Sequence, residues 1–279
     1  MRTRIITDSS ADLMNKEKER VTFVPLTISF DGEEYKDGVT IDHKTFYEKL
    51  IESDVLPTTS QATPFNFAEK FKEVEEAGES AVVITISSKL SGTYQSAMIA
   101  AEDFENIYVV DGDSAAVGGG ILVEYALQLV DQGLEAREIA EKLEKVKEKV
   151  VVVALVDTLE YLKKGGRISS AVAFAGTVLN IKPVISLTNG TINILGKARG
   201  SKQGNNLLVQ EIEKAGGADF TKPVLLGYTG ISDTLLLKYI EDSKAIWEGN
   251  MDEIRYTTIG SAIGTHIGPG AVAVAFFKK

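Results

Sequence analysis

The sequence predicts an α/β protein of two domains: an N-terminal domain with a parallel α/β/α sheet, and a smaller C-terminal α+β domain. In the first half of the 279 residues, short apolar β-branched runs alternate with amphipathic segments, the pattern of strands joined by helices. In the second half, a hairpin signal is mixed with further strand–helix units. The length suits two ordinary domains. We expect the boundary near residue 150, with domains 1–150 and 151–279.

Three apolar runs and four amphipathic stretches make up the predicted N-terminal domain. The runs cover residues 5–6, 81–86 and 107–110. The run at 81–86 reads AVVITI, which is typical of a strand buried on both faces. The amphipathic stretches predict helices at 45–53, 65–77, 120–132 and 136–147. This alternation favours a parallel sheet with helices on both sides.

The second half begins with a predicted hairpin. Its strands are 182–187 and 192–195, and Asn189-Gly190 suits a turn that needs positive φ at both central residues. A helix at 203–215 should follow and end at Gly216-Gly217. The remaining elements are a strand at 224–228, a helix at 233–242, and strands at 254–259 and 271–277.

Composition excludes several classes of function. The chain has 30 Lys+Arg against 40 Asp+Glu, a net charge of −10, so nucleic acid is a poor candidate for a partner. It has no cysteine, which removes thiol nucleophiles, disulfides, zinc–thiolate sites and iron–sulfur clusters. With only two histidines, His43 and His266, a metal site lacks ligands. We therefore expect no metal and no cofactor.

Hydrophobic segments are too short for a membrane protein. The longest apolar runs, 150–156 and 271–277, have seven residues each, whereas a membrane helix needs about 20. The first residues, MRTRIITDSS, do not contain the apolar core of a signal peptide. We expect a soluble cytoplasmic protein without stable membrane insertion.

Three common motifs of nucleotide-binding and hydrolytic enzymes are absent from the sequence. Residues 190–197 resemble a phosphate-binding loop, but the glycines are one residue too far apart and Ala198 replaces the required hydroxyl. No GxGxxG follows the first strand. At 260–264 the serine stands in the wrong place for a nucleophile elbow.

Hydroxyl groups concentrate in three turns, TDSSADL (7–13), PTTSQATP (57–64) and ISSKLSGTYQSA (86–97). In open α/β sheets, ligands gather outside the carboxyl ends of the strands, where the first and third turns should lie. Ser91, Gly92 and Thr93 stand before a helix and combine hydroxyls with backbone N–H groups, which suits a carboxylate or phosphate. Gly92 lets a ligand oxygen approach the backbone closely.

These polar residues also have structural interpretations. Ser, Thr and Asp are preferred N-caps, so Asp8, Ser10, Thr63 and Ser88 can simply begin helices. N-capping and ligand binding are therefore alternative roles for these residues. The density of hydroxyls in the second and third turns favours ligand binding there.

Two further residues are candidates for the same site. His266 stands in GTHIGPG, where glycines let the backbone turn tightly, although a lone histidine is also often a packing residue. Arg167 follows Lys163-Lys164-Gly165-Gly166, a predicted helix end, where a cation can equally complement the helix dipole. His43 follows Asp42 at a predicted helix start, and we expect it on the surface.

Taken together, six segments resemble those of the DegV family of bacterial lipid-binding proteins, and they cover essentially the whole chain. They are TDSSADL (7–13), PTTSQATP (57–64), ISSKLSGTYQSA (86–97), DTLEYLKKGGRIS (157–169), LNIKPVISLTNG (179–190) and GTHIGPGA (264–271). The resemblance implies a DegV-like fold of two α/β domains that hold a long-chain fatty acid, such as palmitate, stearate or oleate, between them.

The resemblance also implies a function and a site. The chain would be a lipid-binding carrier, not an enzyme, which presents the carboxylate of the fatty acid to a separate ATP-dependent fatty-acid kinase. The acyl phosphate formed there would enter phospholipid synthesis. Thr59 and Ser91 would hydrogen-bond the carboxylate and Gly92 would add its backbone N–H, with His266 and Arg167 beside the headgroup. The bound fatty acid is the implied ligand.

Two alternatives remain open at this point. In the first, Ser91 is the nucleophile and His266 the base of an acyl hydrolase or transferase that acts on lipids. In the second, the same turns bind another amphiphile, such as an isoprenoid or sterol acid. The apolar segment 171–179, AVAFAGTVL, is a candidate for the lining of the tail tunnel, and ordinary core is its competing interpretation.

Overall fold

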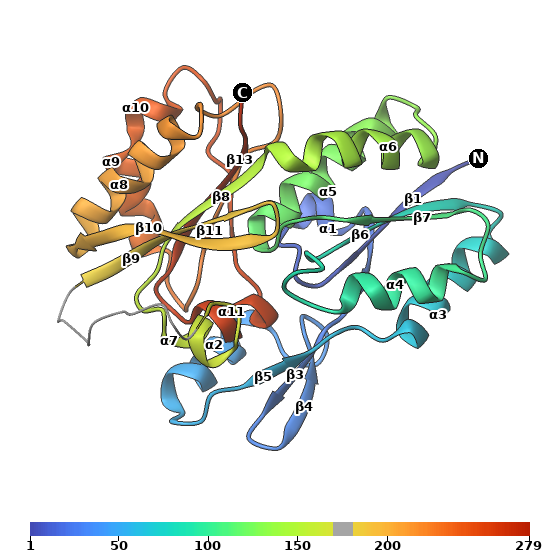
Figure 1. Cartoon of the computed structure of the whole chain (residues 1–279), viewed down its shortest axis with the longest axis horizontal. Coiled ribbons are helices and arrows are strands. Elements are labelled where there is room, and N and C mark those ends of the chain that lie inside the picture. The colour runs from blue at the N-terminus through green and yellow to red at the C-terminus, as the bar shows by residue number, and fades with distance from the viewer. Residues whose placement is uncertain (170–180) are drawn as a thin grey trace.

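Three sheets are formed by the residues that the computed structural model describes, 1–169 and 181–279 (Figure 1). The first sheet has four parallel strands in the order β2-β1-β6-β7. These strands are β1 (Thr3–Asp8), β2 (Val21–Val24), β6 (Ser80–Thr85) and β7 (Ile107–Asp111). Strand β6 is buried along its whole length, as its AVVITI sequence predicts. The parallel sheet of the predicted N-terminal domain is confirmed.

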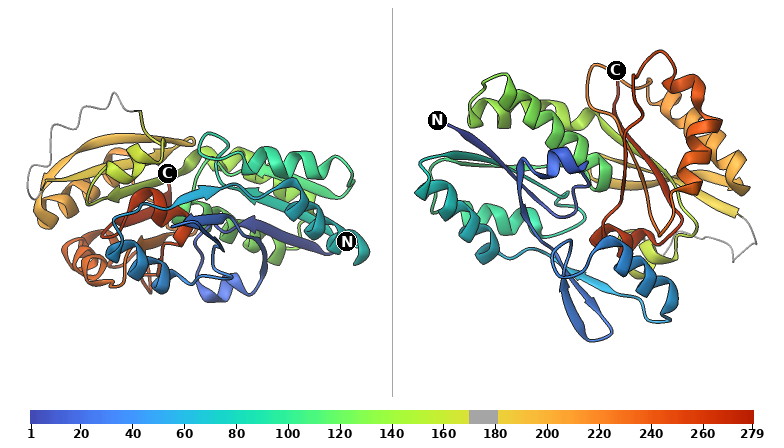
Figure 2. Two further views of the ribbon diagram at one scale, coloured as in Figure 1. Left: turned by 90° about the horizontal axis from the view of Figure 1, so that it is seen from below. Right: turned by 180° about the vertical axis from the view of Figure 1, so that it is seen from behind.

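Helices cover both faces of this sheet because neighbouring strand residues point to opposite sides. Val83 packs with helices α3 and α4 on one face, and Val82 packs with α5 and α6 on the other. The helices of this region are α1 (Asn15–Lys18), α3 (Pro64–Glu76), α4 (Thr93–Ala101), α5 (Ala116–Asp131) and α6 (Ala136–Val146). The α/β/α layers are stacked from top to bottom in Figure 1 and in the right-hand view of Figure 2.

The second sheet is mixed, with the strand order β10-β9-β8-β13-β11-β12. Only the β11–β12 pair is parallel among the pairs of this sheet that the structure describes. Its strands are β8 (Val150–Leu155), β9 (Ile181–Thr188), β10 (Thr191–Arg199), β11 (Leu225–Tyr228), β12 (Tyr256–Thr258) and β13 (Val272–Phe277). The short 3-10 turn η1 (Lys147–Lys149) precedes β8. The predicted hairpin is present, and Asn189 and Gly190 have φ of 48° and 67°.

One face of the second sheet is covered by α8 (Gly200–Lys214), α9 (Thr234–Asp242) and α10 (Lys244–Trp247). Val151 and Val153 of β8 point to that face, whereas Val152 and Ala154 point to the opposite face and share a core with α5. Helix α5 therefore lies between the two large sheets (Figure 1). Because one core joins residues from both halves, the boundary at residue 150 stays a prediction.

Helix α5 is longer than the predicted segment 120–132, since it begins at Ala116. The sequence GGG at 118–120 has low helix propensity and hides the first turn. In the structure these glycines allow close packing. A Cβ at Gly118 would overlap the side chain of Val152 in β8, and one at Gly120 would overlap the carbonyl oxygen of Asp12.

A third, small sheet is a feature that the sequence does not predict. It is antiparallel with the order β4-β3-β5, formed by β3 (Thr27–Phe30), β4 (Glu33–Lys36) and β5 (Thr58–Ser60). Helices α2 (His43–Glu52), α7 (Glu160–Lys164) and α11 (Ser261–Ile267) lie next to it (Figure 2). This sheet and these helices bring segments from the whole length of the chain to one place.

Among the described residues, none of the helices combines the length and the apolar character needed to cross a membrane.

Candidate functional site

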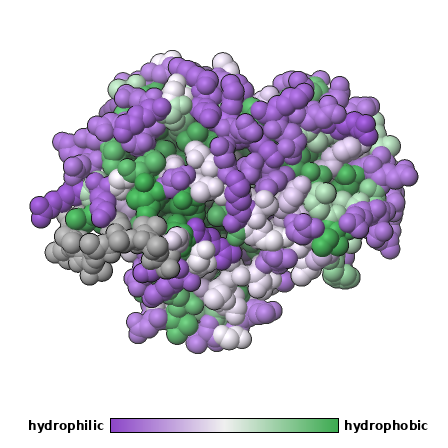
Figure 3. All heavy atoms as spheres, in the orientation of Figure 1, coloured by the Kyte–Doolittle hydropathy of each residue, from purple (hydrophilic) through white to green (hydrophobic). Residues whose placement is uncertain are grey.

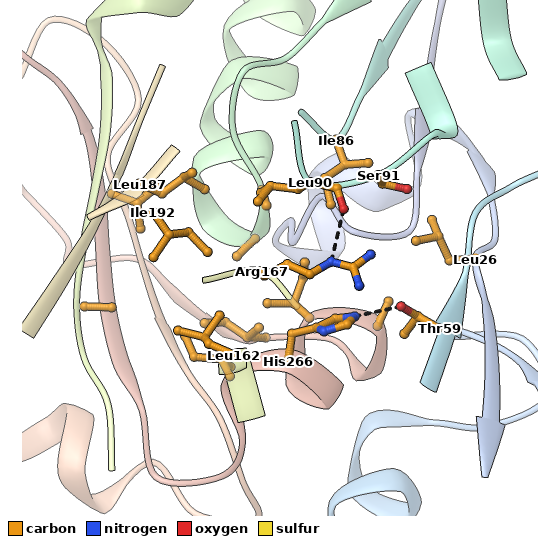
Figure 4. Close-up of a pocket in the computed structure, with 18 of the residues that line it drawn as sticks. Leu26, Thr59, Ile86, Leu90, Ser91, Leu162, Arg167, Leu187, Ile192 and His266 are labelled. Carbon is orange, nitrogen blue, oxygen red and sulfur yellow. Dashed lines mark hydrogen bonds between the residues drawn. The ribbon is translucent and has the colours of Figure 1, made fainter. Parts of the chain in front are cut away.

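A cavity lies where the three sheets meet (Figure 4). It contains about 880 Å³ of space free of protein atoms, its open mouth included. Most of the residues that line it are apolar, and the polar side chains of Thr59, Ser91, Arg167 and His266 are among the others.

Most of the cavity wall is apolar, and six of its residues come from one face of the second sheet. The register places Ala273 of β13 beside Ala154 of β8, and Ala154 beside Ile185 of β9. A second row contains Val152 beside Leu187, and Leu187 beside Ile192 of β10. All six of these side chains line the cavity: Val152, Ala154, Ile185, Leu187, Ile192 and Ala273. In Figure 4, Leu187 and Ile192 lie on the far side of Arg167 from Thr59.

Hydrophobic residues also reach the surface near this wall. The space-filling view shows them gathered over the β9–β10 hairpin, surrounded by hydrophilic residues (Figure 3). Leu195 of β10 is one of the exposed large hydrophobic residues.

Four of the five predicted site residues line the other end of the cavity. They are Thr59 in β5, Ser91 in the loop before α4, Arg167 after α7, and His266 in α11. The four come from separate segments of the chain, and each is partly buried. The structure therefore brings together residues that the sequence predicted from four separate motifs.

His266 is held by Thr59. The two side chains are joined by a hydrogen bond of 2.7 Å between Nε2 and Oγ1 (Figure 4). Burial, with a smaller contribution from the charge of Arg167, lowers the pKa of His266 to about 4. The imidazole is therefore neutral at pH 7. Its Nδ1 atom is buried and has no hydrogen-bond partner among the described residues.

The GTHIGPG segment, expected to be a turn, contains the last part of helix α11, and Gly268 with a φ of 73° ends that helix. The three glycines of this segment are typical of a loop, but Gly264 lies inside the helix and packs closely against a neighbouring side chain. A Cβ at Gly264 would lie 2.5 Å from the hydroxyl of Tyr47. A helix gives His266 a firmer support than the predicted turn.

Arg167 links the two halves of the site. Its Nε donates to the carbonyl of Leu90 at 3.1 Å, and its Nη1 donates to the carbonyl of Gly165 at 2.6 Å. Burial lowers the pKa of this guanidinium, which nevertheless stays charged at neutral pH. Both interpretations of Arg167 hold in part: the bond to Gly165 satisfies the end of α7, and the side chain still faces the cavity.

Gly92 is not among the residues that line the cavity. It is the N-cap residue of α4, and a Cβ there would overlap Oε1 of Gln61. The absence of a side chain thus makes room for Gln61, whose amide donates to Ser96 at 2.9 Å. Gln61 itself lines the cavity, and the TTSQ string was the signal that could have identified it. A backbone contact from Gly92 to a ligand stays a prediction.

The capping interpretation is correct for one of the residues considered. Thr63 is the N-cap of α3 and forms a capping box with Asn66. Asp8, in contrast, is buried and accepts hydrogen bonds from the backbone N–H groups of Ser10 and Ile86.

The segment 171–179, a candidate for the tail lining, lies outside the described residues, so its role stays a prediction. Part of the described wall comes from strands, where residues two apart, such as Val152 and Ala154 or Ile185 and Leu187, share a face. Apolar residues at this spacing in predicted strands were the available signal.

The hydrogen bonds do not favour a serine nucleophile. Ser91 pairs its hydroxyl with that of Thr93 at 2.9 Å, and His266 pairs with Thr59. A nucleophile needs its base within hydrogen-bond reach, and here each group has another partner. In the described part of the chain, no three His, Cys, Asp or Glu side chains gather to hold a metal ion.

His43, which we expected on the surface, is half-buried beside Gly260. Burial lowers its pKa, and the nearby carboxylate of Asp37 partly opposes that effect. Its position reflects contact between α2 and α11, which lie far apart in the sequence.

The fold and the cavity define a class of α/β protein in which a mostly apolar cavity, with a small cluster of polar side chains, lies where the sheets meet. The chain belongs to the DegV family: the model of that family, described as "Uncharacterised protein, DegV family", matches residues 2–279. A DegV domain-containing protein of Caldanaerobacter subterraneus is 32% identical over 281 residues, which cover 99% of this chain and 98% of the relative.

Solved structures of family members have the same fold. A DegV family protein from Thermus thermophilus, whose structure is described as showing fatty acid binding, matches with a TM-score of 0.88 and 32% identity over all of both chains. A stearic acid-binding protein from Eubacterium ventriosum matches with a TM-score of 0.88 and 28% identity, covering 99% of this chain and 98% of that one.

Proposed function

We propose that this protein binds a long-chain fatty acid in the cavity and presents its carboxylate to a separate kinase. One observation carries the first part: a cavity lined mostly by apolar side chains also contains Thr59, Ser91, Arg167 and His266. This lining suits a molecule that is apolar over most of its length and anionic or polar at one end. The relatives described as fatty acid-binding proteins support this assignment.

The energetics of such a ligand match the two ends of the cavity. A tail of about 15 methylenes, at roughly 0.8 kcal/mol each, contributes on the order of 12 kcal/mol before the costs of association. A carboxylate cannot be buried without hydrogen bonds. Two hydroxyls, an imidazole and a guanidinium can supply them, and each such bond to a charge contributes about 1.5–3 kcal/mol. The tail provides affinity and the polar groups fix orientation.

The degree of burial supports presentation of the carboxylate to another protein. Thr59, Ser91, Arg167 and His266 are only partly buried, so the polar end of the ligand lies near the surface. The sequence has no phosphate-binding loop of its own, and an ATP-dependent kinase would supply the phosphoryl group. The exposed residues Lys163, Lys164, Arg199 and Lys202 are candidates for its docking surface.

Lipid extraction tests the first part. Protein purified from bacterial cells is extracted with organic solvent, and the extract is analysed by mass spectrometry. We expect about one long-chain fatty acid per chain. The assignment is contradicted if no fatty acid is recovered and the stripped protein does not bind added palmitate or oleate. Recovery of an isoprenoid or sterol acid instead would contradict the fatty-acid assignment as well.

A coupled reaction tests the second part. Protein loaded with palmitate is incubated with ATP and the fatty-acid kinase of the same cells, and acyl phosphate is trapped with hydroxylamine. We expect product only when all three components are present. Loaded protein and ATP without the kinase serve as the control. Product formation in this control would show that the chain catalyses the transfer itself and would contradict the carrier role.

A further inference from the structure

The TDSSADL segment has no part in the cavity lining, although the sequence singles it out. Two of its carboxylates, Asp8 and Asp12, are 0% and 3% exposed, and Asp37 in the following region is 2% exposed. A buried carboxylate is costly unless it is hydrogen-bonded, so each of the three needs a partner. Their partners lie on the two sides of the polar end of the cavity.

Asp8 holds the beginning of the loop that carries Ser91. Its Oδ2 accepts from the backbone N–H of Ile86 at 2.7 Å, and its Oδ1 accepts from that of Ser10 at 2.9 Å. Ile86 follows β6 directly and lines the cavity. The loop then turns back on itself, because the N–H of Ser91 donates to the carbonyl of Ser87. Asp8 therefore fixes the point from which Ser91 is placed.

Asp12 and Asp37 hold the start of the helix that carries His266. Oδ1 of Asp12 accepts from the N–H of Gly260 at 2.8 Å. The two oxygens of Asp37 accept from the N–H groups of Ser261 and Ala262 at 3.2 and 3.3 Å. A helix leaves its first N–H groups without partners inside the helix, and Gly260 has no side chain to cap them. Carboxylates more than 200 residues away in sequence do so instead.

The helix is short, so its start determines where His266 lies. Helix α11 has seven residues, and His266 is in its last turn, bonded to Thr59. The chain just before α11 is fixed by Tyr47 as well, whose hydroxyl donates to the carbonyl of Ile259 at 2.9 Å. A shift at the start of such a helix passes directly to the imidazole.

We infer that Asp8, Asp12 and Asp37 are positioning residues of the polar end: without touching the ligand, they fix the loop of Ser91 and the helix of His266 so that both side chains meet one carboxylate. This inference rests on the proposed fatty-acid binding and deepens it. It also gives the TDSSADL segment a role that neither capping nor direct contact provides.

Asp12 and Asp37 differ in a way that allows a sharp test. Asp12 uses one oxygen, and its Oδ2 has no hydrogen-bond partner among the described residues. Burial raises the pKa of Asp12 well above the usual range, which favours the neutral acid. An asparagine can replace a neutral acid that accepts one bond. Asp37 accepts with both oxygens, and an asparagine there would point an NH₂ group at a backbone N–H.

The experiment compares the full-length variants Asp12→Asn, Asp12→Ala and Asp37→Asn with the wild type. Asp42→Asn is the matched control, because Asp42 is an exposed N-cap of α2 and asparagine caps equally well. Binding of palmitate and of hexadecanol, which has the tail without the carboxylate, is measured by displacement of radiolabelled palmitate. The ¹⁵N resonances of the His266 imidazole are recorded by NMR, and folding is checked by circular dichroism.

We expect Asp37→Asn and Asp12→Ala to weaken palmitate binding about tenfold, to change hexadecanol binding less than about twofold, and to shift the His266 resonances. Asp12→Asn and Asp42→Asn should resemble the wild type. Equal losses for both ligands, or unchanged palmitate binding and His266 resonances, would overturn the inference. If Asp37→Asn does not fold, the Asp12→Ala and Asp12→Asn pair decides. A wild type that binds neither ligand would instead contradict the proposed function.

Discussion

The two ends of the cavity are built in different ways. The apolar end is one face of a sheet, in which Val152, Leu187 and Ile192 are held by continuous strand pairing. The polar end collects single residues from four separate segments, and side-chain hydrogen bonds such as Thr59 to His266 hold it together. Affinity and orientation of the ligand therefore depend on different parts of the molecule and should respond separately to mutation.

The largest expected effect comes from a charge at the apolar end. Leu187→Asp places a carboxylate against the tail, and loss of several methylene contacts at about 0.8 kcal/mol each weakens palmitate binding on the order of 100-fold. Calorimetric titration measures the change. Thr188→Asp, next along β9 and not in the cavity lining, is the control and should bind normally. Equal affinity of the two variants would show that the tail does not lie on this wall.

Removal of a hydroxyl at the polar end should have a smaller and more selective effect. Thr59→Val and Ser91→Ala each delete one hydrogen bond to the carboxylate, and we expect about tenfold weaker palmitate binding for each. Hexadecanol binding should change little. Thr58→Val, on the exposed neighbour in β5, is the matched control. A double variant that still prefers palmitate to hexadecanol as strongly as the wild type would contradict the assignment.

The smallest effect concerns the dependence of the free energy of unfolding on pH, measured on protein from which lipid has been extracted. Folding lowers the pKa of His266 to about 4 from the usual 6.5, so between these values the unfolded chain binds more protons. The free energy of unfolding therefore falls as the pH drops from 7 to 5, by on the order of 1 kcal/mol from this residue. His266→Gln removes this contribution. Urea unfolding of both proteins at pH 7 and pH 5 measures the difference, and parallel pH dependence would disprove it.

The sequence predicted the elements that are determined locally. The AVVITI strand and the Asn189-Gly190 hairpin depend on neighbouring residues, and both are present. The three-stranded sheet was missed because β3 pairs with β5, some 30 residues later, and β5 reads TTS without an apolar residue, although Ile28 and Phe30 of β3 alternate with polar residues. Helix α11 was missed because a glycine at position 264 is typical of a turn. In the structure, Gly264 lies inside the helix, where close contact with Tyr47 leaves no room for a side chain.

The candidate site divides in the same way. Thr59, Ser91, Arg167 and His266 were predicted from motifs, and the structure places all four at one end of the cavity. Their supports could not be predicted, because Asp12 and its partner Gly260 are 248 residues apart in the sequence. Every residue except proline has a backbone N–H, so no sequence pattern indicates which N–H a given carboxylate will bind. Long-range contacts of this kind require the fold itself.

The glycines of α5 have a consequence for the dimensions of the cavity. Gly118 lies against Val152, and Val152 also lines the cavity. Ala115 and Ala116, at the same end of α5, line the cavity as well. A methyl group added at position 118 would overlap Val152 and displace it towards the cavity. The width of the cavity at Val152 therefore depends in part on Gly118, which does not itself line the cavity.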